Sequence, residues 1–135
     1  HLHGHTYSNL VMNSACGGSS HFIGTGLLTI TEGADKSDAS QVFRNLLLSE
    51  KARAEAIPEL EVLADDVSAA HGAASAPIDR NQMHYLMSRG LNPQEAQSMI
   101  VHGFLLNAFS NLTNKCLIEE MRTRLTVHLE CELRR

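Results

Sequence analysis

The histidines at the start of the sequence are the first side chains with metal-binding chemistry. His1, His3 and His5 alternate, so on a β-strand they would share one face, and neutral imidazole is a common metal ligand. The triplet lies at a chain end, however, where side chains are usually mobile. We therefore interpret it as a mobile segment rather than a metal site. Cys16 and His21 would add ligands only if the fold brought them close.

Another histidine, His71, lies in the segment ADDVSAAHGA, between small residues and directly before a glycine. This setting can leave an imidazole uncovered at the end of a strand. Such a side chain is either a satisfied surface or interface histidine or a functional one. Asp65 and Asp66 form a carboxylate pair before it, but adjacent residues of a strand point to opposite faces. We interpret the pair as a turn or capping element.

The three cysteines do not match a known site pattern. Cys16, Cys116 and Cys131 are widely spaced without any CxxC, which argues against a disulfide framework and a zinc knuckle and favours a reducing compartment. On one straight helix Cys116 and Cys131 would lie roughly 22 Å apart, too far to belong to the same ligand site. The sequence also lacks the GxSxG, HExxH, P-loop and dinucleotide-binding motifs, so no enzyme class is indicated.

The composition is that of one modest domain. The chain has 135 residues, 43% of them hydrophobic, and a formal charge of -4, which disfavours a nucleic-acid partner. No apolar run approaches the roughly 18 to 20 residues that span a bilayer, so we expect no membrane partner and a cytoplasmic location, or an organelle stroma in a eukaryote. No charged residue occurs from His1 to Thr31, which predicts a piece of a larger protein.

Short apolar runs in the first part of the chain predict β-strands. The runs HFIGTGLLTIT, SQVFRNLLLS and PELEVLADDV are centred near Leu28, Leu47 and Val62, at spacings of about 19 and 15 residues. A strand every roughly 15 to 20 residues is typical of a β-solenoid in which each rung covers the next. The same runs also fit an antiparallel sandwich, and the pattern alone does not distinguish the two.

Helical signals begin after Ile78. Asp79 is placed to cap a first helix, which Gly90 would end as a left-handed residue. Asn92 is placed to cap a second helix, with a proline directly after it and Glu95 at the third helical position. The predicted helices are Arg80–Arg89, Pro93 to about Asn111, and a third from about Asn114. We expect a β domain over residues 1–78 and a helical subdomain over 79–135.

Several long runs of the sequence resemble one known family. The run PELEVLADDVSAAHGA, followed by YLMSRGL and EAQSMIVHGF, is similar to the C-terminal part of the SufB/SufD family. Members of this family are iron–sulfur cluster assembly proteins that form a complex with the ABC-type ATPase SufC. The upstream run GHTYSNL resembles another segment of the same family, so the resemblance covers nearly the whole chain.

The resemblance implies a fold that is mainly β plus α. This fold is the C-terminal end of a right-handed parallel β-helix (β-solenoid), followed by a small helical subdomain of about three helices. It also implies that the β-helix pairs edge to edge with a SufB-like paralogue or with a second copy. The terminal helices would dock a SufC-like ATPase, with Tyr85, Arg89 and Gly90 as the docking candidates by position.

Individual positions favour a SufD-like member. SufB proteins carry a cysteine where this chain has Phe43, and a glutamate where it has Gly72. His71 matches the histidine that SufD contributes to the SufB–SufD interface, where it is implicated in cluster formation. The segment SMIVHGF is nearer to SufB. The implied role is a non-enzymatic scaffold in which His71 is the candidate interface residue and metal ligand. The chain alone would bind no cofactor tightly, and a transient iron–sulfur cluster would form at a dimer interface.

Two other functions compete with this interpretation. The chain could be a structural dimerisation fragment, or a SufB-like cluster scaffold, without independent chemistry. A β-helix hydrolase of polysaccharides is disfavoured, because such enzymes need clustered acidic side chains and this chain offers only the adjacent Asp65 and Asp66.

Overall fold

The computed structural model describes the backbone through Leu133 and the side chains through Leu129. The chain divides into two compact units, His1–Ala76 and Pro77–Arg135. We call them the β unit and the helical unit. None of the described helices is both long and apolar enough to cross a lipid bilayer.

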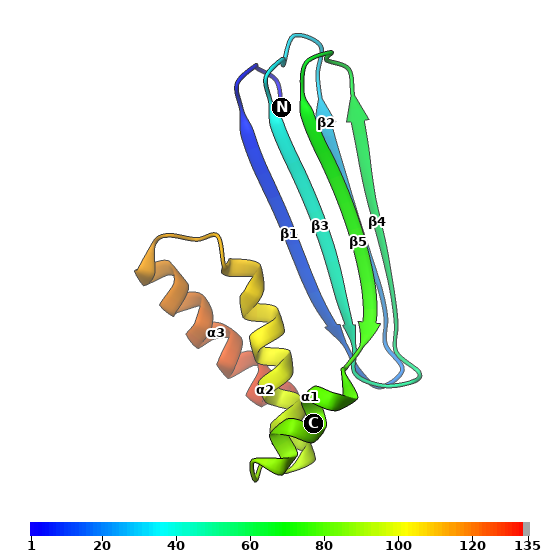
Figure 1. The fold of residues 1–135 in the computed structure, drawn as a ribbon, viewed down its shortest axis with the longest axis vertical. Helices are drawn as coiled ribbons and strands as arrows, with labels where there is room; N and C mark the ends of the chain where they lie inside the picture. Colours follow the sequence, from blue (N-terminus) through cyan, green and yellow to red (C-terminus); the bar gives the residue numbers. More distant parts are fainter. Residues whose placement is uncertain (134–135) are drawn as a thin grey trace. The chain divides into compact units, whose positions relative to one another are not determined.

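The β unit consists of two sheets whose strands run parallel to their neighbours (Figure 1). One sheet has the order β1-β3-β5 and the other pairs β2 with β4. The strands are β1 (Tyr7–Cys16), β2 (His21–Ile30), β3 (Asp38–Leu47), β4 (Arg53–Val62) and β5 (Ser68–Pro77). The fold is therefore mixed: parallel strands in two sheets, followed by helices.

Consecutive strands lie in different sheets, so each strand pairs with the strand two places further along the chain. Tyr7 pairs with Asp38, and His21 pairs with Arg53, so the paired residues are 31 and 32 positions apart in the sequence. The predicted spacing of about 15 to 20 residues therefore separates consecutive strands, which lie in different sheets, and not the strands that pair with each other. Parallel pairing also excludes the antiparallel sandwich.

The sequence pattern located β2 and β3 but missed β1 and β5, and it placed β4 five residues too late. Pro58 was taken as the start of β4, whereas it lies inside that strand. The main-chain N–H of Arg53 donates to the carbonyl of Ser20, directly before β2, and that of Leu63 donates to Ile30 at the end of β2. Even-numbered residues of β4 therefore direct their backbone groups to the free edge. A proline is tolerated there because its missing N–H removes no bond between the two strands.

The core of the β unit lies between the sheets and is built around β3, where buried side chains alternate with more accessible ones. Ile30, Ala39 and Phe43 supply apolar contacts, and polar side chains share the same interior. Gly26 on β2 makes room for Phe43, since a Cβ at this glycine would lie 2.6 Å from the Cζ of the ring.

The helical unit contains α1 (Arg80–Ser88), α2 (Pro93–Leu106), a 3-10 turn (Asn107–Phe109) and α3 (Lys115–Leu133). Two predicted start signals are confirmed: Asp79 caps α1, and Asn92 and Glu95 form a capping box on α2. The second helix was predicted to reach about Asn111, but its α-helical part ends at Leu106 and a 3-10 turn follows.

Candidate functional site

The side chain of His71 lies on the face of β5 that is directed toward the second sheet. Four residues further along the strand, the Oγ of Ser75 accepts a hydrogen bond from Nδ2 of the buried Asn45 at 3.0 Å. The Ser75 hydroxyl also lies 3.4 Å from the carbonyl oxygen of Ala54 on β4. Since residues four apart on a strand share a face, His71 points inward as Ser75 does. Its side chain is nevertheless exposed.

The exposure of His71 follows from the position of β5 at one edge of its sheet. The N–H of Ser68 donates to the carbonyl of Ser37, so even-numbered residues of β5 direct their backbone toward β3. The odd-numbered residues, including His71 and Ala73, therefore direct their N–H and C=O groups to the free edge. Two kinds of group are thus available at β5: an imidazole and a row of main-chain donors and acceptors.

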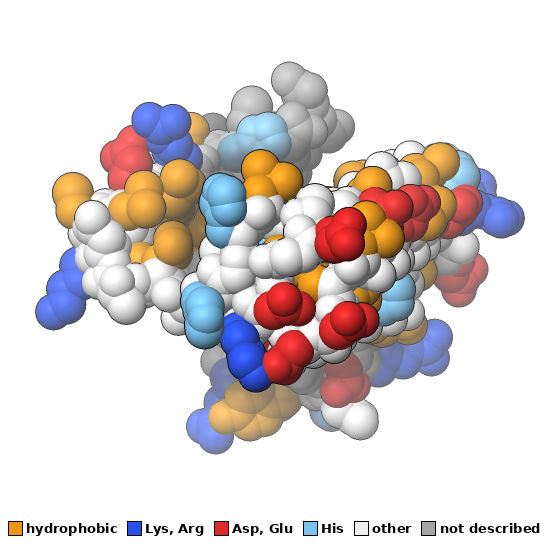
Figure 2. All heavy atoms as spheres, turned by 90° about the horizontal axis from the view of Figure 1, so that it is seen from above, with side chains coloured by type: hydrophobic (Ala, Val, Ile, Leu, Met, Phe, Trp, Pro, Cys, Tyr) orange, Lys and Arg blue, Asp and Glu red, His pale blue; other side chains and the backbone are white. Residues whose placement is uncertain are grey.

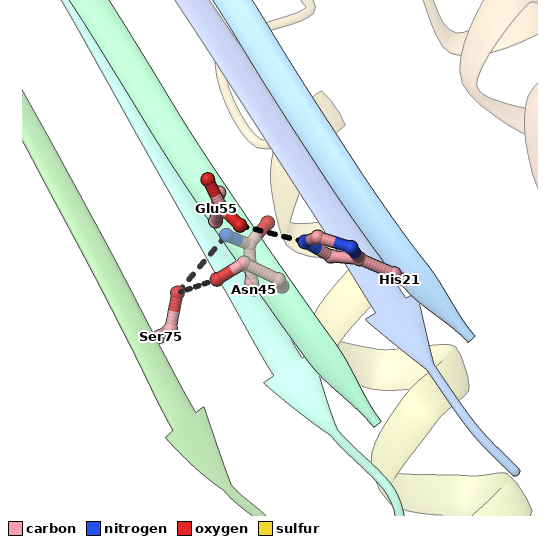
Figure 3. A network of polar contacts seen from close by, with 5 residues as sticks. His21, Asn45, Glu55 and Ser75 are labelled. Carbon is pink, nitrogen blue, oxygen red and sulfur yellow. Dashed lines mark hydrogen bonds and ion pairs between the residues drawn. The ribbon is translucent and has the colours of Figure 1, made fainter. Parts of the chain in front are cut away.

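A ladder of polar side chains on the inner face holds β5 in place. Oδ1 of Asn45 accepts a hydrogen bond from the Ser14 hydroxyl at 2.5 Å, and its Nδ2 donates to Ser75. The ladder joins β1, β3 and β5, and Figure 3 shows the contacts of Asn45 and Ser75. Sequence reasoning missed both residues, because their roles depend on which strands pair.

Gln41 lies beside His71 in the register of β3 with β5, since Ser68 stands opposite Asp38. Its fully buried amide donates from Nε2 to the carbonyls of Gly26 at 3.2 Å and Glu59 at 2.8 Å. Gln41 thereby ties β3 to both strands of the other sheet. Its Oε1 is buried without a hydrogen-bond partner among the described residues. The position next to His71 is thus rigidly held.

The described residues contain no group of three or more His, Cys, Asp or Glu side chains that could hold a metal ion. His1, His3 and His5 do not lie on a strand: residues 3–5 form a bend, and His5 has a φ of 58°. The ring of His1 contacts the hydroxyls of Thr6 and Ser8. His71 can contribute only one ligand, so a cluster bound there would need further ligands from outside the described residues.

The cysteines lie apart from this site. Cys16 is buried at the end of β1, with its Sγ 3.9 Å from the Ser14 hydroxyl. Cys116 is exposed in the first turn of α3, where its N–H donates to Asn114. The side chain of Cys131 lies outside the described residues.

Tyr85 and Arg89 form a surface pair on α1. The Arg89 guanidinium lies 5.3 Å from the centroid of the Tyr85 ring, a cation–π arrangement between residues four apart. Gly90 follows with a φ of 99°, and the N–H groups of Gly90 and Leu91 close the helix end. This confirms that Gly90 ends the helix. The positive φ alone accounts for a glycine at this position, so contact with a partner protein is not needed to explain it.

A groove of about 810 Å³ lies in the helical unit, with residues of α2 and α3 in its lining. Leu91, Met99 and Leu129 give it apolar walls. His102 and Thr126 cross it with a hydrogen bond of 2.9 Å between Nε2 and Oγ1.

Comparisons with known proteins point to one family. A family model described as SUF system FeS cluster assembly, SufBD core domain, matches residues 1–104. The iron–sulfur cluster assembly protein SufD of Escherichia coli is 37% identical over 100 residues, which are 74% of this chain and 24% of that protein. SufD of Bacillus subtilis is 39% identical over 112 residues, 83% of this chain and 25% of that protein.

A SufBD family protein of Mycobacterium bovis is 33% identical over 141 aligned positions, covering 98% of this chain and 34% of that protein. The chain therefore spans about a quarter to a third of the length of these three relatives.

Proposed function

The chain belongs to the SufB/SufD family of iron–sulfur cluster assembly proteins, in which it is SufD-like, and we propose that it acts as a scaffold component of a SufBCD-type complex. In this role it binds no substrate for catalysis. It pairs through β5, presents His71 to the partner, and docks the ATPase through its helices. The observation that carries the proposal is the inward-facing but exposed His71 on a strand with a free edge.

We propose that the β unit forms the last turns of a right-handed parallel β-helix. The strands pair in parallel, the chain alternates between two sheets, and paired residues are 30 to 32 positions apart. Two strands per turn would account for that register. Connections between parallel strands of the same sheet are almost always right-handed.

The two sheets offer different edges to a pairing chain. On β4, the free edge contains Pro58, which has no N–H to donate. On β5, the free edge runs past Ala69, His71 and Ala73, whose small neighbours leave the backbone accessible. A SufB-like paralogue or a second copy would therefore add its strand at β5.

A strand added at β5 would cover His71 and shield it from water. Iron–sulfur clusters need several thiolate or imidazole ligands, and an interface between two chains supplies ligands from both sides. His71 would act there as one ligand, or as the group that accepts and returns a proton while the cluster forms. The cluster is the cargo of this site, held only during assembly.

Helices α1 and α2 are the proposed docking surface for the SufC-like ATPase. Tyr85 is 57% exposed and Met99 is 53% exposed, so both offer apolar area to a partner. Arg89 adds a cation held in place over the Tyr85 ring. Since Gly90 only ends the helix, its contribution is to fix the direction of the chain after Arg89.

The test of the His71 role uses the chain co-purified with a SufB-like partner and a SufC-like ATPase. After anaerobic reconstitution, iron and acid-labile sulfide are measured together with the mass of the complex. We expect His71→Ala to keep the complex and lose the cluster, whereas the exposed His3→Ala keeps both. Full cluster content in His71→Ala would remove this residue from the mechanism. A stable pair that never takes up iron, even as wild type, would identify a dimerisation module instead.

The pairing and docking surfaces have separate tests. Ala73→Pro removes an N–H from the free edge of β5 and should weaken association, while Ala73→Ser keeps the N–H and should not. In a pull-down with the ATPase, Tyr85→Ala and Arg89→Ala should reduce binding, and the exposed Arg124→Ala on α3 should not. Unchanged association in these variants would move the respective interface elsewhere.

A further inference from the structure

The outer face of the β2–β4 sheet is a surface that the proposed pairing at β5 does not use. Even-numbered residues of β2, such as Gly24 and Ile30, are buried between the sheets. Odd-numbered residues of both strands therefore project outward. We call this set the β2–β4 face; it consists of His21, Ile23, Thr25, Leu27, Thr29, Arg53, Glu55, Ile57, Glu59 and Glu61.

Large apolar side chains lie uncovered at the centre of this face. Ile23 is 55% exposed, Leu27 62% and Ile57 41%. In the register of the sheet, Ile57 stands opposite Thr25, between the two β2 residues. The three side chains therefore form one continuous patch rather than scattered exposed residues, and such patches mark contact sites.

Carboxylates border the patch along β4. Glu55 stands opposite Ile23, Glu59 opposite Leu27, and Glu61 next to Glu59 on the same face. Arg53 is the only Lys or Arg on the face. The Nε2 of His21 lies 2.7 Å from Glu55 at one end (Figure 3). The face therefore carries a net negative charge at neutral pH.

The β unit as a whole is also acidic. The β unit has four Lys and Arg against nine Asp and Glu. Figure 2 shows many acidic side chains at one end of the molecule. The outer face of β3, by contrast, balances Asp38 with Arg44. A basic partner is thus favoured on the β2–β4 face over the opposite sheet.

We propose that the β2–β4 face binds a basic amphipathic helix of a protein partner. Ile23 and Leu27 are roughly 13 Å apart along the strand, and helical residues eight positions apart are separated by about 12 Å. Apolar residues on one side of such a helix would cover the patch, and Lys or Arg on its flank would meet Glu55, Glu59 and Glu61. A second copy of the face, a nucleic acid or an anionic lipid surface would be repelled by the same carboxylates.

The experiment measures binding of a fluorescent peptide to the full protein by anisotropy at low ionic strength. The probe is an alanine-based helical peptide with leucine at every fourth position and lysine next to each leucine. A matched peptide has glutamate in place of each lysine. We expect the lysine peptide to bind, the glutamate peptide not to bind, and the affinity to fall with added salt.

Variants place the binding site on the face. Glu59→Gln combined with Glu61→Gln should weaken binding about tenfold, whereas Glu32→Gln combined with Glu50→Gln, with the same charge change elsewhere, should have little effect. Leu27→Ser should weaken binding by a similar factor, and the exposed Tyr7→Ser on β1 should not. Ile57→Ser provides a second apolar variant in case Leu27→Ser alters the fold, which circular dichroism would show.

Three results would overturn the proposal. The wild-type protein does not bind the lysine peptide, both charge pairs weaken binding equally, or the apolar variants leave it unchanged. Equal effects of the two charge pairs would mean diffuse attraction to an acidic protein. Because Leu27 projects from the outer face of the other sheet and not from the free edge of β5, Leu27→Ser should leave pairing with a SufB-like partner intact, so this test and that of the proposed function fail independently.

Discussion

Replacing the buried Asn45 by alanine should destabilise the β unit by about 1.5–3 kcal/mol. The side chain is 3% exposed and makes two hydrogen bonds, one from Ser14 at 2.5 Å and one to Ser75 at 3.0 Å. Loss of the Asn45 acceptor leaves the half-buried Ser14 hydroxyl with only the long 3.9 Å contact to Cys16 Sγ, which costs about 1–2 kcal/mol. Loss of the Ser75 bond costs less, about 0.5–1 kcal/mol, because water reaches Ser75 and replaces the partner.

The chain contains a matched control for this substitution. On the outer face of the same sheet, the Ser40 hydroxyl donates to Oδ1 of Asn9 at 3.1 Å. This pair has the same chemistry and joins the same two strands, but both residues are accessible to water. Asn9→Ala should therefore change the free energy of unfolding by no more than about 0.5 kcal/mol.

Urea unfolding followed by circular dichroism gives both free energies, and amide hydrogen exchange reports whether β5 opens first. A loss of about 1.5–3 kcal/mol should lower the melting temperature of a unit this size by on the order of 10 °C. The Asn45→Ala protein should also exchange its β5 amides faster than Asn9→Ala does. Equal losses in the two variants, or a loss below about 1 kcal/mol for Asn45→Ala, would refute the assignment of the ladder as the anchor of β5.

Three further substitutions follow from the geometry. Gly26→Ala should cost about 1–3 kcal/mol in urea unfolding, because the new Cβ meets the Phe43 ring at 2.6 Å. Gly90→Ala should cost about 1 kcal/mol, since the φ of 99° strains a residue with a side chain. The hydrogen bond and charge of Asp66 raise the pKa of Lys36 above 10.5. The stability from this pair is therefore present below the unfolded pKa and lost as pH rises through the folded one. In an NMR titration, Asp66→Asn should lower the Lys36 pKa.

Local signals in the sequence were sufficient where a few adjacent residues determine the structure. The capping box of Asn92 and Glu95 and the left-handed Gly90 each act over one helical turn, so both could be identified from spacing alone. The end of α2 was placed too late, because nothing local in the sequence predicted the 3-10 turn that follows Leu106.

The strands show the opposite case. β5 reads SAAHGAASAP and contains no β-branched or aromatic residue, so propensity gives it no signal. It is a strand because of hydrogen bonds to residues about thirty positions earlier in the chain. The N–H of Ser68 donates to Ser37, directly before β3, and the Ser75 hydroxyl accepts from Asn45 on β3. The roles of Gln41 and Asn45 could not be predicted for the same reason. The hydrogen bonds of Gln41 to the other sheet and of Asn45 to Ser14 and Ser75 can be identified only when the strand pairing is known.

The same dependence on register explains why His71 is available at all. Leu10, Gln41 and His71 occupy equivalent inward positions on β1, β3 and β5. Gln41 is fully buried because strands flank β3 on both sides, whereas His71 is exposed because β5 has a single strand neighbour in the described part of the chain. A chain that pairs with β5 would give His71 a strand neighbour on each side, as Gln41 has on β3. Pairing and burial of the imidazole are therefore one event, so chemistry at His71 would take place inside the interface and not in solvent.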